Sequence, residues 1–233
     1  MLKMGSISYK VIVRPLLILF LAGAANAGYE LLGSTEPAVR MREAQRMGNE
    51  LDRESVPYLV ELLGDESAGV RVNAAVSLGR LGSEEAVRPL IRALKEDPSP
   101  AVRVMAAQAL GGFRGESVIE ALSEAAGGED ELVGSAAVRA LGRSGREEAM
   151  EKLIEKAGRS RVSRVREAAL DALTEILESE DPDEDTLNSI DRAAGRAARD
   201  RNPQVREAAD KARSGVERSR ERREGQQERG PQR

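Results

Sequence analysis

A Val-Arg dipeptide recurs along this chain at almost constant spacing, and this recurrence limits the fold more than any other feature. Five copies keep both residues and one keeps only the valine: Val39-Arg40, Val70-Arg71, Val102-Arg103, Val133-Gly134, Val165-Arg166 and Val205-Arg206. The intervals between them are 31, 32, 31, 32 and 40 residues. A period of this length is the signature of a solenoid, in which each repeat is one small unit that stacks on its neighbours. The spacing therefore predicts a stacked array rather than a single globular core.

Each period contains two amphipathic helices. The first begins at the valine and repeats apolar or small residues at i, i+4, i+5, i+7 and i+8, as in Val70, Ala74, Ala75, Ser77 and Leu78. The second repeats apolar residues at i, i+3, i+4 and i+7, starting at Val56, Val87, Val118 and Met150. Both patterns place one apolar stripe along a helix. A hairpin of this kind buries its stripe only against neighbouring copies, so stacking is expected.

Glycines recur near the end of the first helix. They follow its last large apolar residue in four copies: Gly48, Gly79, Gly111 and Gly142. Glycine adopts the left-handed backbone conformation that commonly ends a helix. We therefore expect a left-handed helix cap at these positions.

The repeats predict an all-α fold, a right-handed α-solenoid of about five helix pairs over residues 36–215, with a C-terminal capping helix. The first copy carries Glu43 at a position where later copies have alanine, and the last carries Asp210 and Arg213 in place of leucines. Polar residues on the outer face are typical of terminal caps. We expect the capping helix to begin near Pro203 and to run to about residue 224. The polar residues beyond it are expected to be disordered, and we assign 216–233 as a whole to a charged, largely disordered tail.

The order of residues within the repeat also resembles that of a known family. Asp65 is followed by Val70-Arg71, Ala74-Ala75, Leu78-Gly79, Leu81-Gly82, Ala86-Val87 and Leu90-Ile91. This order is similar to the HEAT-like repeats named after phycobilisome lyases, and residues 36–215 carry the resemblance. It implies a helical solenoid and leaves the function open, because such repeats serve as scaffolds, inhibitors and a few enzymes.

The amino-acid composition excludes most kinds of catalytic site. The chain contains no cysteine and no histidine, so thiol nucleophiles, imidazole ligands and histidine-based triads are excluded. Aromatic residues make up 2% of the sequence. We expect no cofactor and no catalytic residue. The resemblance leaves one alternative, an enzyme or enzyme accessory related to bilin lyases; a di-iron hydroxylase of similar repeats builds its sites on histidine, which is missing here.

The first residues have the pattern of an export signal. Lys3, Lys10 and Arg14 precede the apolar run 16–22, and small residues at 25–27 suggest cleavage after Ala27. We assign 1–27 to a signal peptide and 28–35 to a linker, and place the mature chain in the periplasm or outside the cell. An uncleaved anchor is the alternative, and it would be the only membrane contact. Cleavage leaves a formal charge of −7, which argues against nucleic acid as a partner.

Two charged features have a structural and a functional interpretation. Aspartates near the helix starts, such as Asp65 and Asp97, can pair with the repeated arginines across stacked units or form an anion-binding ladder; we favour the structural pairing.

The acidic insertion 178–185 carries its carboxylates at alternating positions, Asp181, Asp183 and Asp185. That spacing suggests calcium, but Thr186 and Arg192 stand where a calcium loop needs glycine and glutamate. An acidic cap on the next helix is the expected role.

The second helices offer a surface for a partner. Residues projecting away from their apolar stripes alternate in sign from one repeat to the next: Tyr58, Glu61, Arg92, Glu120, Lys152 and Glu155. A mixed-charge ridge fits a protein or peptide better than a polyphosphate. The sequence thus predicts a monomeric, non-enzymatic interaction scaffold that binds a protein along the concave face of the solenoid.

Overall fold

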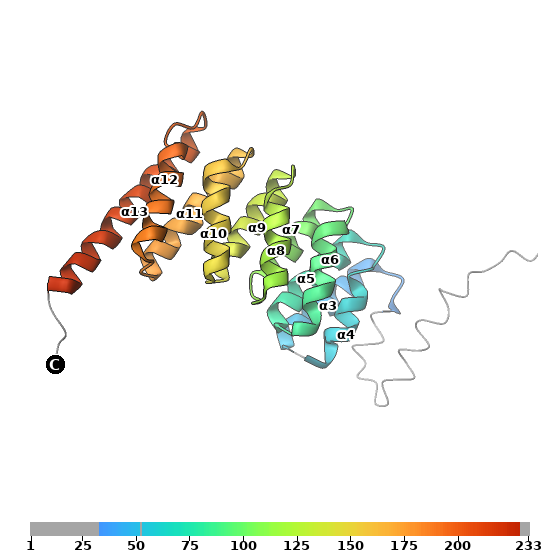
Figure 1. Cartoon of the computed structure of the whole chain (residues 1–233). Helices are drawn as coiled ribbons and strands as arrows, with labels where there is room; N and C mark the ends of the chain where they lie inside the picture. The colour runs from blue at the N-terminus through green and yellow to red at the C-terminus, as the bar shows by residue number, and fades with distance from the viewer. Residues whose placement is uncertain (1–32, 52, 229–233) are drawn as a thin grey trace, which may run out of the picture.

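The computed structural model describes residues 33–51 and 53–228, which form a row of antiparallel helix pairs (Figure 1). The first helices of the five pairs are α3 (Pro37–Glu50), α5 (Ala68–Leu81), α7 (Pro100–Leu110), α9 (Glu131–Arg143) and α11 (Ser163–Ser179). The second helices are α4 (Val56–Leu62), α6 (Val87–Glu96), α8 (Glu116–Ala126), α10 (Glu147–Arg159) and α12 (Glu184–Ala197). Short 3-10 turns at Arg53–Ser55 and Glu84–Ala86 lead into α4 and α6. A single helix, α13 (Pro203–Glu228), ends the row, so the expected five pairs and capping helix are confirmed.

The core is one continuous seam between the two layers of helices. The repeated leucines of the first helices are at most 1% exposed: Leu78, Leu110, Leu141 and Leu173. The second helices add leucines that are fully buried, among them Leu59, Leu90, Leu122 and Leu153. Complete burial of such a side chain stabilises the fold by about 1.5 to 3 kcal/mol. Because each leucine lies between neighbouring repeats, the seam holds the row together as well as closing each hairpin.

The repeated glycines do not cap their helices as the sequence suggested. Gly48, Gly79 and Gly142 lie inside α3, α5 and α9, and Gly111 follows α7 with φ −63°. A Cβ atom added to Gly79 would lie 2.8 Å from the Cβ of Ala109 on α7, and one on Gly142 would lie 2.9 Å from that of Ala172. The glycines are therefore contact points, where the absence of a side chain lets adjacent first helices approach closely.

The left-handed caps lie three residues further on. Leu51, Gly82 and Gly145 have φ values of 54°, 60° and 59°. The Gly82 N–H donates to the carbonyl of Leu78, and that of Leu51 to the carbonyl of Met47. These bonds satisfy carbonyls that the helix end leaves free. The predicted cap chemistry is thus present, but it is displaced by almost one turn.

The C-terminal helix ends at Glu228, close to the expected end near residue 224, and it crosses the domain boundary predicted at residue 215. Residues 216–228 continue α13 instead of forming a tail. Val216 is 1% exposed, and Arg222 donates to the carbonyl of Leu177 at 2.6 Å. Ion pairs join Arg220 to Glu184 at 3.0 Å and Arg223 to Asp181 at 2.9 Å. The extension is held because these arginines meet the end of α11 and the acidic insertion, a contact that the local charge pattern does not reveal.

Residues 1–32, which contain the predicted signal peptide and most of the predicted linker, lie outside the described residues. Among the helices that the structure does describe, none is long and apolar enough to cross a membrane.

Candidate functional site

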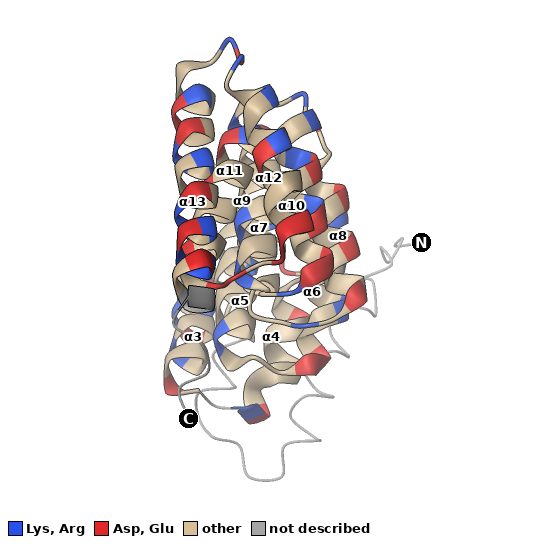
Figure 2. Cartoon of the chain, turned by 60° about the vertical axis from the view of Figure 1, so that its left-hand side comes forward, with Lys and Arg blue, Asp and Glu red and all other residues tan. Residues whose placement is uncertain are grey.

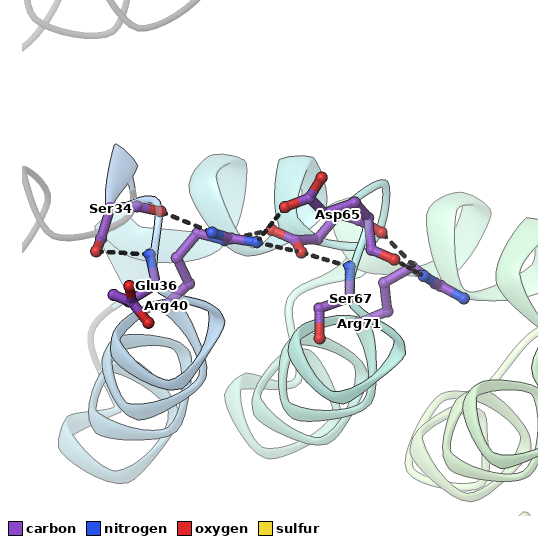
Figure 3. Close-up of polar contacts among 7 residues, drawn as sticks. Ser34, Glu36, Arg40, Asp65, Ser67 and Arg71 are labelled. Carbon is purple, nitrogen blue, oxygen red and sulfur yellow. Dashed lines mark hydrogen bonds and ion pairs between the residues drawn. The ribbon is translucent and has the colours of Figure 1, made fainter.

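The repeated arginines and aspartates form clasps, which are ion pairs between neighbouring repeats; Figure 3 shows the clasp of Arg40 and Asp65. Arg71 of α5 donates from Nε and Nη2 to the two carboxylate oxygens of Asp97, at 2.7 and 2.9 Å. Its third nitrogen donates to the backbone carbonyl of Asp65 in its own repeat, at 2.9 Å. Asp97 also accepts the N–H of Ser99, which immediately precedes α7. Each clasp therefore fixes the start of one first helix against the start of the next.

The clasp recurs at four of the five junctions between first helices. Its ion pairs are Arg40–Asp65 at 2.7 Å, Arg71–Asp97 at 2.7 Å, Arg103–Asp130 at 2.9 Å and Arg166–Asp200 at 2.6 Å. The predicted structural pairing is confirmed. Fewer of these aspartates cap a helix than expected, because only Asp130 is itself an N-cap. Asp65, Asp97 and Asp200 instead accept the backbone N–H of the residue two positions ahead.

Burial and hydrogen bonding set the protonation of these aspartates. Desolvation acts to raise the pKa of Asp97, but hydrogen bonds from Arg71 and the Ser99 N–H outweigh it and hold that pKa below its ordinary value. The pKa of Asp200 is lowered in the same way, against desolvation, by the Asn202 N–H and Arg166. In Arg40, Arg71 and Arg166 all three guanidinium nitrogens donate to groups of the protein, which gives the clasp a structural role.

The junction between α9 and α11 lacks the clasp. Gly134 stands where the other first helices carry arginine, and Ser160 stands where the partner aspartate would be. A Cβ on Gly134 would lie 2.9 Å from Cγ2 of Val165 on α11, so the glycine allows a close apolar contact instead. Both members of the ion pair are missing together, and neither charge is left buried without a partner.

The acidic insertion serves the helix that follows it. Asp183 is the N-cap of α12, and its carboxylate accepts the N–H of Thr186 at 2.7 Å. This bond is the largest cause that lowers the pKa of Asp183. Asp181 pairs with Arg223, as described above, while Asp185 is exposed within the first turn of α12. The expected acidic cap is confirmed. In the described part of the chain no three carboxylates lie close enough to hold a metal ion; calcium was the alternative that the sequence did not favour.

The predicted partner-binding residues lie one or two to a helix along the second-helix layer. Glu61, Arg92, Glu120 and Glu155 are exposed, while Tyr58 and Lys152 are half-buried. Within the described residues no ion pair joins any two of these six. Neighbouring second helices are instead linked by Lys95 and Glu124, at 2.5 Å. Figure 2 shows charges of both signs over this layer. The six residues form a dispersed ridge, from α4 to α10, rather than one converging site.

A hollow of about 640 Å³ opens on the opposite layer, along the first helices at the junction that has no clasp. Arg139 and Arg143 of α9 line one side, and Asp171 and Glu175 of α11 line the other. The remaining lining residues come from the same two helices and the start of α13: Glu131, Arg164, Glu167, Ala168, Ala172, Asn202 and Gln204. At the four positions named first, the hollow is therefore bounded by arginines on α9 and carboxylates on α11, while Glu131 of α9 and Arg164 of α11 carry the opposite signs.

A second hollow of about 620 Å³ continues along the same layer. Val76 of α5 and Met105 of α7 supply its apolar lining, and Arg143 belongs to both hollows. Arg143 extends over Gly111, where a Cβ would meet its Nη2 at 2.6 Å, and donates to the carbonyl of Gln108. We call the two hollows together the first-helix groove, which runs from α5 to the start of α13. Besides the residues named above, Gly79, Arg80, Ala109 and Gly112 line it.

Most charges in the groove are unused by the fold. Among the described residues, Arg139, Asp171 and Glu175 form no ion pair with one another or with a neighbour. Desolvation raises the pKa of Asp171, opposed by Lys211 and helped by Glu175 and Glu207. The side chain is nevertheless in contact with solvent at the mouth of the hollow. In contrast, no buried side-chain nitrogen or oxygen of the described chain lacks a hydrogen bond.

The fold and the ordered clasps define an α-solenoid repeat protein. The family model for HEAT repeats matches residues 28–98 and 87–174, more than half of the sequence, and the chain belongs to the HEAT-repeat family. No curated protein sequence matches it significantly.

Several solved structures share the fold. An archaeal HEAT-like repeat protein from Thermococcus onnurineus is 18% identical with a TM-score of 0.52, covering 91% of this chain and 94% of its own. The complex of CpcE and CpcF of phycocyanin lyase from a Nostoc species is 23% identical, with a TM-score of 0.52 and coverage of 84% and 89%. An engineered protein is 20% identical, with a TM-score of 0.53 and coverage of 83% and 96%. At these identities the likeness shows the fold.

Proposed function

We propose that this chain is a non-enzymatic, protein-binding scaffold that works outside the cytoplasm, in the cell envelope or beyond it. The observation that carries the proposal is the division of its polar groups. All buried side-chain nitrogens and oxygens of the described residues have hydrogen-bond partners, whereas many charged side chains are exposed along the length of the row. Surfaces of this kind favour an extended partner with charges of its own.

The non-enzymatic part of the proposal is supported by residue chemistry. A catalytic site requires a nucleophile or a base that lies beside an activating group. These residues are most often histidine, cysteine or a buried carboxylate. The chain has no histidine or cysteine. Among the described residues, the buried carboxylates are Glu43, which accepts from Arg46, and Asp97, which accepts from Arg71 and Ser99. Repeat solenoids present broad surfaces on which proteins commonly bind.

The location rests on the N-terminal pattern of three basic residues, an apolar run and small residues before Gly28. The test combines both parts of the proposal. The full-length gene product is expressed with a C-terminal affinity tag, the envelope and exterior fractions are treated with a cross-linker, and retained proteins are identified by mass spectrometry. N-terminal sequencing of the same material should begin at Gly28.

The control for this experiment alters the predicted ridge of the second helices. Glu61→Lys combined with Glu120→Lys reverses two exposed charges without touching the core. Loss of the captured protein in this variant would assign binding to the ridge, and its retention would assign binding to another surface. Recovery of the protein in the cytoplasm with residues 1–27 intact, or the absence of any saturable partner, would contradict the proposal.

A further inference from the structure

The first-helix groove presents three kinds of chemistry in a fixed order along the row. At its α5–α7 end, Val76 and Met105 supply apolar surface beside Arg80, which is hydrogen-bonded to Asn49. Arg139 and Arg143 make the centre basic, and α11 supplies acidic residues together with Arg164. The acidic residues are Asp171 and Glu175, which occupy the positions on α11 that correspond to the two arginines on α9, 32 residues earlier. The two charge rows therefore run side by side on neighbouring helices.

The stability of the fold does not require this order of side chains. Opposite charges on adjacent helices would normally approach and pair, as Lys95 and Glu124 do between α6 and α8. Here a hollow of about 640 Å³ separates them. The same junction is the one at which the repeat pattern is interrupted by Gly134 and Ser160. Local departures from an otherwise consistent pattern mark functional places in many proteins.

We propose that the first-helix groove binds an extended segment of a partner protein that carries an apolar anchor, then acidic residues, then basic residues. This inference rests on the proposed scaffold function and gives it a site and a partner chemistry. The anchor packs on Val76 and Met105, the acidic residues face the α9 arginines, and the basic residues face Asp171 and Glu175. Asp171 and Glu175 form no ion pair among the described residues, although the charge of Lys211 already acts to lower the pKa of Asp171, so both carboxylates can accept a cation from the partner.

The dimensions fit a short segment. Adjacent packed helices are about 8 to 10 Å apart, so the distance from α5 to α11 is about 25 to 30 Å. An extended chain advances about 3.3 Å per residue, and the span therefore corresponds to roughly eight or nine residues. A helix would need roughly 18 residues for the same length. An extended segment thus reaches all three regions with the smallest number of ordered residues.

The order of charges provides the test. Two synthetic nine-residue peptides of identical composition are compared, one with the order apolar, acidic, basic and the other with the order apolar, basic, acidic. Reversing the direction of binding does not convert one order into the other. We expect the first peptide to bind the purified chain about three- to tenfold more tightly at low salt, measured by fluorescence anisotropy, with the difference decreasing as salt is added.

A charge-exchanged variant sharpens this comparison. Arg139→Glu and Arg143→Glu together with Asp171→Lys and Glu175→Lys leave the net charge unchanged, and all four residues are exposed. We expect this variant to prefer the second peptide by a similar factor. The matched control exchanges charges on the second helices, with Arg88→Glu, Arg92→Glu, Glu61→Lys and Glu120→Lys, and should keep the original preference. Circular dichroism establishes that both variants remain folded.

The outcomes separate the two proposals. Equal binding of the two peptides, a preference that the exchange does not reverse, or no binding of either peptide would overturn the groove assignment. If the envelope pull-down still captures a partner in that case, the scaffold function stands and another surface is responsible. If the groove binds its peptide but the pull-down captures nothing, the groove assignment stands and the location proposed for the protein is wrong.

Discussion

Arg71 and Asp97 are joined across two repeats by a pair of hydrogen bonds, 2.7 Å from Nε to Oδ2 and 2.9 Å from Nη2 to Oδ1. The two side chains are only 10% and 6% exposed. Asp97 receives the Ser99 N–H as well, while Arg71 also binds the Asp65 carbonyl. Four polar connections thus meet at one buried point between α5 and α7. Removing either charged residue leaves the other buried without its partner.

Asp97→Ala is expected to lower the free energy of unfolding by about 3 to 5 kcal/mol, since it leaves the Arg71 guanidinium uncompensated. Urea unfolding followed by circular dichroism measures the change. Glu207→Ala is the control, because its ion pair with Lys211 is exposed and lies within α13; its effect should be much smaller, since solvent screens such a pair. Equal effects of the two substitutions would show that the buried clasp has no special role.

Acid should weaken the clasps. The pKa values of Asp97, Asp130 and Asp200 are lowered in the fold, whereas an unfolded aspartate titrates near about 3.9. Their stabilisation is therefore fully present above roughly pH 5 and is lost as the pH falls below about 4 toward the native pKa values. Urea midpoints measured over this range should decrease, and Asp97→Asn should make the decrease shallower because one titrating clasp is gone.

Asp171 should affect the pH dependence of stability in the opposite direction. Its native pKa is raised, mainly by desolvation, so its ionised form opposes folding at neutral pH and the penalty disappears on protonation. Asp171→Asn should therefore raise the urea midpoint at pH 7 and leave it nearly unchanged in acid. A lower midpoint at pH 7 would mean that Lys211 stabilises the carboxylate more than desolvation disfavours it.

The fold could be predicted from the sequence because the repeat period, the apolar stripes of the helices and the arginine–aspartate pairing are all local or repeated features. Arg71 and Asp97 could be matched from spacing alone. Gly79 could not be interpreted correctly, since its role depends on how closely α5 approaches Ala109 on α7. The first-helix groove was missed for a related reason. Arg139 and Asp171 each look like an ordinary solvated position, and only the separation of their helices shows that they leave a hollow. The 32-residue register between them was the available signal.

Gly79→Ala should destabilise the row, because its Cβ would lie 2.8 Å from the Cβ and 2.9 Å from the Cα of Ala109. Relieving this overlap requires the two helices to separate, at a cost of about 1 to 3 kcal/mol. Gly195→Ala in α12 is the matched control, with nothing within 4 Å of the added Cβ. It should be neutral or stabilise by up to about 1 kcal/mol. Thermal melts of both variants distinguish contact from helix propensity.

The extension of α13 should be part of the folded unit. A chain that ends at Gly215 loses the buried side chains of Val216 and Ser219 and the bond from Arg222 to the Leu177 carbonyl. It also loses the two ion pairs that hold the acidic insertion, and we expect a decrease in unfolding free energy of about 2 to 4 kcal/mol. A chain that ends at Glu228 is the control and should match the full-length protein. Equal stability of the chain ending at Gly215 would mean that the last turns of α13 only rest on α11. A loss confined to that chain would show that the C-terminal arginines close the solenoid.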